Sequence, residues 1–106
     1  MTTAAVGQRG RTRITDRVAT RIAIQSAAEL PAVLRVDTGG PMWAQATEAK
    51  VAGEAIAIRL AVTVAYPVPL RELSAQIRDY VAHRVAQLTG LAVSRVDLRI
   101  TTELQP

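Results

Sequence analysis

Histidine, cysteine and paired carboxylates are the side chains that most often do chemistry, and this chain of 106 residues holds few of them. It has no cysteine, which excludes disulfides, thiolate metal sites and thiol nucleophiles. Its single histidine, His83, falls beside Glu72 and Asp79 on the polar side of an expected helix, without a nucleophile or a second metal ligand. Carboxylates such as Glu48 and Glu54 are all that remains for an enzymatic alternative. We therefore expect no catalytic residue, no metal site and no cofactor, and a protein that acts by binding.

Arginine is the main charged residue of the chain, and it is concentrated near the N-terminus. The net charge is +4, and the first 21 residues carry all of this excess. Such a cluster could neutralise the phosphates of nucleic acid or of anionic lipid headgroups. The alternative is a solvated segment in a sequence that uses arginine in place of lysine throughout. The candidate residues for an anionic partner are Arg9, Arg11, Arg13, Arg17 and Arg21.

Met42 and Trp43 follow a Gly-Gly-Pro segment and form a second candidate contact. A tryptophan in a loop can fold down over the core, or it can stand exposed as an anchor for a partner, as interface hot spots often do. The sequence leaves both alternatives open.

Hydrophobic periodicity predicts the elements that must position these residues. The apolar spacing is helical in two segments and alternates in the strands, and Thr15 and Gly90 are suited to cap the two helices. The expected elements are a helix over 16–30, a strand over 33–37, a weak strand over 44–51, a strand over 55–66, a helix over 70–88 and a strand over 95–104.

This α-β-β-β-α-β order predicts an α+β fold, a two-layer sandwich with both helices on one face of a mixed four-stranded sheet. A right-handed crossover through the second helix would set the last strand parallel to the long one. We expect residues 1–10 to be a flexible basic N-terminal arm and residues 11–106 to be a single domain.

The sheet face turned away from the helices is the last candidate site. In the long strand, large aliphatic residues alternate with small or polar ones, so the aliphatic side must be core. The opposite side either packs closely against a partner or is a wet face stabilised by cross-strand charge pairs. The candidate protein-contact surface consists of Met42, Trp43, Arg59, Thr63, Arg95, Asp97 and Arg99.

Two stretches of the sequence carry a family resemblance. The first is Gly10-x3-Ile14-Thr15-x2-Val18-x3-Ile22-Ala23, continuing to Glu29 and Val33. The second is the long strand ending in Tyr66, followed by Leu70, Gln76, Val81, Thr89-Gly90-Leu91, Val93, Val96 and Ile100. In their order and spacing these residues resemble the alkaline shock protein family of bacterial envelope stress response proteins.

The resemblance implies a cytoplasmic, non-enzymatic protein that serves cell-envelope homeostasis and associates with itself. Some members of the family are recruited to the membrane by a small transmembrane protein. The implied partners are therefore further copies of the chain and a small transmembrane anchor protein. We therefore expect a non-catalytic accessory protein that forms homo-oligomers and docks to a membrane-linked partner. The alternative is a small nucleic-acid-binding domain that uses the arginine-rich arm.

Overall fold

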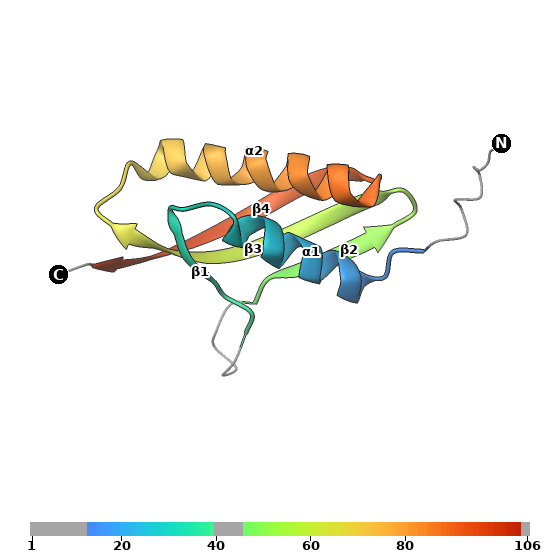
Figure 1. Cartoon of the computed structure of the whole chain (residues 1–106), viewed down its shortest axis with the longest axis horizontal. Coiled ribbons are helices and arrows are strands. Elements are labelled where there is room, and N and C mark those ends of the chain that lie inside the picture. The colour runs from blue at the N-terminus through green and yellow to red at the C-terminus, as the bar shows by residue number, and fades with distance from the viewer. Residues whose placement is uncertain (1–12, 40–45, 105–106) are drawn as a thin grey trace.

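The computed structural model describes residues 13–39 and 46–104 and shows the predicted order of two helices and four strands (Figure 1). The elements are α1 (Asp16–Ala28), β1 (Val33–Val36), β2 (Glu48–Ala52), β3 (Ala55–Tyr66), α2 (Leu70–Thr89) and β4 (Ala92–Leu104). The predicted α+β fold is confirmed.

The long strand β3 is the centre of the sheet. Along one edge it pairs in parallel with β4 over its whole length, from Ala55 opposite Ala92 to Tyr66 opposite Leu104. Along the other edge β2 pairs with the first half of β3 and β1 with the second half, both antiparallel. The sheet is therefore mixed, and the helical crossover sets β4 parallel to β3 as predicted.

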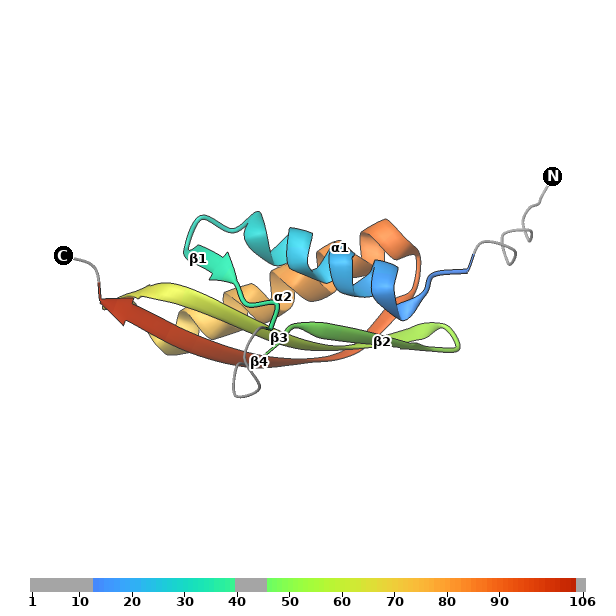
Figure 2. The same ribbon diagram turned by 90° about the horizontal axis from the view of Figure 1, so that it is seen from below.

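Both helices cover the same face of this sheet (Figure 2). Helix α1 lies against β1, β2 and β3, whereas α2 packs on β4 and on the flank of α1. The buried core is almost entirely aliphatic and lies between the two layers. Its largest fully buried members are Ile56, Ile58, Leu60, Val62, Val64, Ile77, Val81 and Val85.

Local hydrogen bonds explain where the helices begin and end. The Thr15 hydroxyl accepts a hydrogen bond from the Val18 backbone N–H at 3.2 Å and so caps α1. The Asp16 carboxylate then accepts a 2.8 Å bond from the N–H of Val51, which fixes the start of α1 against β2. Helix α2 ends at Gly90, whose φ of 75° is left-handed and suits glycine.

Five apolar residues that the periodicity assigns to the core side are exposed instead. Each lies within three residues of the end of its helix or strand. The buried part of each of these elements is therefore shorter than its apolar pattern. These residues are Val18, Tyr66, Leu70, Leu88 and Leu104.

Candidate functional site

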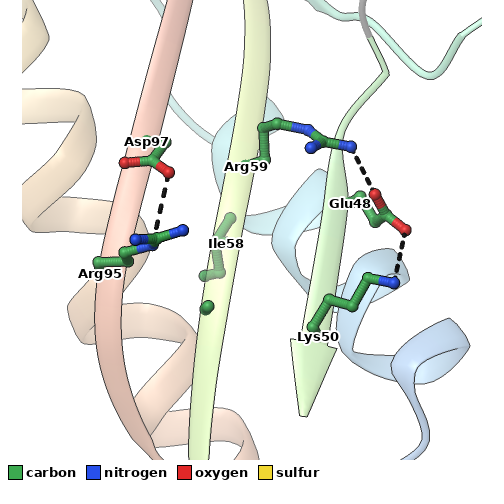
Figure 3. Close-up of a pocket in the computed structure, with 7 residues that line it drawn as sticks. Glu48, Lys50, Ile58, Arg59, Arg95 and Asp97 are labelled. Atoms are coloured by element: carbon green, nitrogen blue, oxygen red, sulfur yellow. Dashed lines mark hydrogen bonds and ion pairs between the residues drawn. The ribbon is translucent and has the colours of Figure 1, made fainter.

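The sheet face turned away from the helices carries a shallow depression of about 220 Å³ (Figure 3), and we call this face the open face. The pairing register explains how the depression forms. Ala57 of β3 is opposite Lys50 of β2 on one side and Arg95 of β4 on the other. Because a single methyl group stands between two long side chains, the sheet is hollow there.

The charged residues that line this depression form ion pairs with one another. On β2, Glu48 accepts a 2.6 Å hydrogen bond from the Arg59 guanidinium and lies 3.4 Å from the Lys50 ammonium. On β4, Arg95 lies 3.4 Å from Asp97. All five side chains are well exposed, so each pair contributes only about 0–1 kcal/mol to stability. These side chains can therefore exchange their present partners for others at small cost.

The open face has an excess of positive charge around the depression. Lys50, Arg59 and Arg95 line it together with Glu48 and Asp97. Arg99 is exposed one step further along the same side of β4, and no salt bridge joins it to another described residue. This gives four cations against two carboxylates, so the net charge around the depression is positive.

Thr63 differs from the other candidate contact residues because it is buried, with only 1% of its surface exposed. Its hydroxyl lies 3.2 Å from an Asp37 carboxylate oxygen and donates a hydrogen bond to it. Arg35 of β1 also reaches across β3 to Glu103 of β4 and covers this end of the sheet. Of the predicted contact residues that the structure describes, Arg59, Arg95, Asp97 and Arg99 are therefore the exposed ones.

Three of the five arginines predicted to bind an anionic partner lie in the described residues, just before α1 or in its first turns. Arg13, Arg17 and Arg21 are all exposed, and Arg17 and Arg21 are one helical turn apart. Arg9, Arg11, Met42 and Trp43 lie outside the described residues.

Histidine and carboxylates are the remaining side chains that could do chemistry. His83 is exposed on α2. Among the residues that the structure describes, no group of three or more histidines and carboxylates could hold a metal ion. No described helix is both long enough and apolar enough to cross a membrane.

A cluster between the helices was not anticipated from the sequence. Glu29, which caps the C-terminal end of α1, accepts hydrogen bonds from Arg84 at 3.1 Å and from the Tyr80 hydroxyl on α2. The Arg84 bond, helped by that of Tyr80, lowers the pKa of the Glu29 carboxyl, and the same carboxylate raises the pKa of Tyr80. The one sequence signal is the i,i+4 spacing of Tyr80 and Arg84, which places both on one side of α2.

The sequence profile of the alkaline shock protein 23 family, which has a cell envelope-related function, matches residues 5–102. The chain belongs to this family. No curated protein sequence matches the chain.

Several solved structures share the fold of this family member. A variant of the MamM CTD is 15% identical with a TM-score of 0.59, covering 82% of this chain and 94% of its own. A cadmium form of another MamM CTD variant is 15% identical with a TM-score of 0.58, covering 82% and 95%. The MamB CTD, a magnetosome protein of Desulfamplus magnetovallimortis BW-1, is 10% identical with a TM-score of 0.60, covering 83% and 96%. At these identities the likeness concerns the fold alone.

Proposed function

We propose that this protein is a non-catalytic accessory protein of the bacterial cell envelope that associates with itself and docks to a membrane-linked partner through the open face. Membership of a family with a cell envelope-related function supports the cellular role. The observation that carries the docking site is the depression over Ala57 with its surrounding charges.

The chemistry of the open face defines the partner that would fit it. Three cations and two carboxylates line the depression around the small residue Ala57, and Arg99 lies beside it, so a partner can approach closely at Ala57 and meets net positive charge. Complementary charge favours a contacting segment that carries more acidic than basic side chains. The partner we propose is therefore a membrane-linked protein with an acidic segment that faces the cytoplasm.

Charge reversal at the centre of the open face tests this proposal. Arg59→Glu removes a cation from the middle strand, far from the helices, whereas Arg71→Glu makes the same change on the exposed surface of α2. The full chain and both variants are used to capture proteins from the membrane fraction of the cells that produce it. We expect one integral membrane protein to be recovered with the native chain and with the Arg71→Glu variant, but not with the Arg59→Glu variant.

The identity of the captured protein provides a second requirement. It should carry an acidic segment on its cytoplasmic side, and a peptide of that segment should compete with its capture. Equal recovery by the Arg59→Glu variant, or recovery of no membrane protein by the native chain, would refute docking through the open face.

A second candidate function is favoured by one observation, the exposed arginines at the start of α1. None of Arg13, Arg17 and Arg21 forms a salt bridge with another described residue. A nucleic-acid-binding role for them requires binding to duplex DNA that weakens steeply with added salt and with replacement of these arginines by alanine. Absence of binding at low salt would exclude this role.

A further inference from the structure

The outer edge of β4 is a long strand edge without a partner in the described parts of the chain. Along its inner edge β4 pairs with β3, and no other strand among residues 13–39 and 46–104 pairs with it. An unpaired edge presents backbone N–H and C=O groups that can bind a further strand. Natural proteins commonly protect such edges with proline or lysine, and β4 contains neither over its 13 residues.

The charges of β4 are complementary to themselves in one antiparallel register. When two copies of β4 pair about a two-fold axis through Leu98, Asp97 of each copy lies opposite Arg99 of the other. This register creates two pairs of opposite charge on the open face. It also supplies a charged neighbour for Arg99, which has no salt bridge among the described residues of its own chain.

The same register matches the apolar side of β4. Leu98 meets Leu98 of the second copy, and Val96 meets Ile100. All three side chains are half-buried against the core in the single chain, so pairing removes further apolar surface from water.

Neighbouring registers are disfavoured by charge. An axis through Asp97 would place Arg95 opposite Arg99, and an axis through Arg99 would place that arginine opposite itself. An axis through Ile100 would oppose Asp97 and Glu103, two carboxylates. Like charges directly opposite each other destabilise strand pairs, so charge disfavours these three registers. An axis through Val96 would also pair opposite charges, Arg95 with Asp97, but it would set Leu98 opposite Ser94, where the pairing of β4 is irregular, and would lose the apolar match of the Leu98 register.

We propose that two copies of this chain pair through β4, antiparallel and about Leu98, to form one continuous eight-stranded sheet. This inference rests on the self-association included in the proposed function, and it assigns that self-association to the outer edge of β4. The dimer joins the two open faces into one larger charged surface and removes the exposed edge of each copy.

Sedimentation of the purified full chain and its charge variants tests the pairing. The native chain should sediment as a dimer, at twice its 11.4 kDa chain mass. Asp97→Arg and Arg99→Asp each place like charges opposite each other twice, so each variant should weaken the dimer by about tenfold or more. Both side chains are exposed, so neither variant should unfold. Arg17→Asp makes the same charge change as Arg99→Asp, but on α1, which does not contact β4. This control variant should leave the dimer intact.

Mixing provides the decisive result. An equimolar mixture of the Asp97→Arg and Arg99→Asp chains should form a heterodimer, because both cross-strand pairs again have opposite charges. The double variant D97R/R99D should likewise regain the native homodimer. A monomeric native chain, an unchanged dimer in the single variants, or a mixture that stays monomeric would overturn the proposal.

Single cysteines test the register, since the native chain has none. In the proposed dimer only position 98 lies opposite itself, so Leu98→Cys should be cross-linked on oxidation and Thr102→Cys should not. Cross-linking at both positions, or only at position 102, would contradict the register. These results are separable from membrane-protein capture, because the Arg59→Glu variant retains the β4 edge and should still dimerise.

Discussion

Arg35 of β1 and Glu103 of β4 meet at 3.2 Å across the central strand β3. The two residues belong to opposite edges of the sheet, so their side chains must pass over β3 on the open face. Thr63 lies beneath, and Asp37 lies 3.6 Å from Arg35 and accepts the hydrogen bond of the Thr63 hydroxyl. This arrangement buries Thr63 at one end of the open face, whereas the Arg59 side chain further along β3 is exposed.

The hydroxyl of Thr63 should therefore contribute to stability rather than to binding. Thr63→Val keeps the shape of the buried side chain but removes its hydrogen bond to Asp37, and we expect it to lower the free energy of unfolding by about 1 kcal/mol. Thr101→Val changes the neighbouring, exposed threonine of β4 and should have little effect. Urea unfolding of both variants measures the difference. Equal effects would show that the Thr63 bond contributes nothing.

Thr47 bonds the backbone of β3 through its side chain, between the part of β3 that pairs with β2 and the part that pairs with β1. Its buried hydroxyl accepts a 3.1 Å hydrogen bond from the N–H of Ala61 and lies 3.3 Å from the carbonyl oxygen of the same residue. Thr47→Val would leave that buried N–H without this acceptor, so we expect a loss of about 1–3 kcal/mol in the free energy of unfolding. Thr47→Ser retains the hydroxyl and should recover most of that loss. If serine and valine destabilise equally, the methyl group rather than the hydrogen bond matters.

The order of elements could be predicted because the signals that determine it are local. Alternating residues in β3 and the helical spacing of Leu73, Ile77 and Val81 identify their elements without knowledge of the fold. Thr15 and Gly90 marked the helix ends by their own chemistry. The mixed sheet then followed from the handedness of the crossover.

Contacts between distant residues could not be predicted in this way. Alternation places Ala61 and Thr63 on the open face, yet both are buried, because Asp37, Thr47 and the bridge from Arg35 to Glu103 cover them. The predicted strand over 44–51 begins only at Glu48 in the described residues, since Thr47 binds β3 through its side chain. For the candidate site, the sequence identified the charged residues but not the partner of each charge.

Gly90 ends α2 with a left-handed backbone that no other residue type adopts as readily. A Cβ atom added there would meet nothing within 4 Å, so a substitution is penalised by the φ of 75° alone and not by a clash. We expect Gly90→Ala to destabilise the protein by about 1 kcal/mol and Gly90→Asn by less, because asparagine tolerates this conformation. Thermal unfolding measures both. Equal destabilisation by alanine and asparagine would contradict a purely conformational cause.

The cluster of Glu29, Tyr80 and Arg84 should make stability depend on pH at the acidic end. Hydrogen bonds from Arg84 and Tyr80 lower the pKa of the Glu29 carboxyl in the folded protein below its ordinary value of 4.5. The unfolded chain therefore takes up this proton first as the pH falls. The stabilisation is complete above pH 4.5 and is lost as the pH falls through the lower, folded-state pKa.

Glu29→Gln removes the charge and tests this dependence. The native chain should unfold at higher urea concentration than the Glu29→Gln variant at neutral pH, and the difference should shrink towards zero in acid. Glu54→Gln is the matched control, because the exposed Glu54 side chain forms no hydrogen bond or salt bridge with the described residues. A difference between native and Glu29→Gln chains that stays constant from neutral to acidic pH would show that the carboxylate does not link the two helices through its charge.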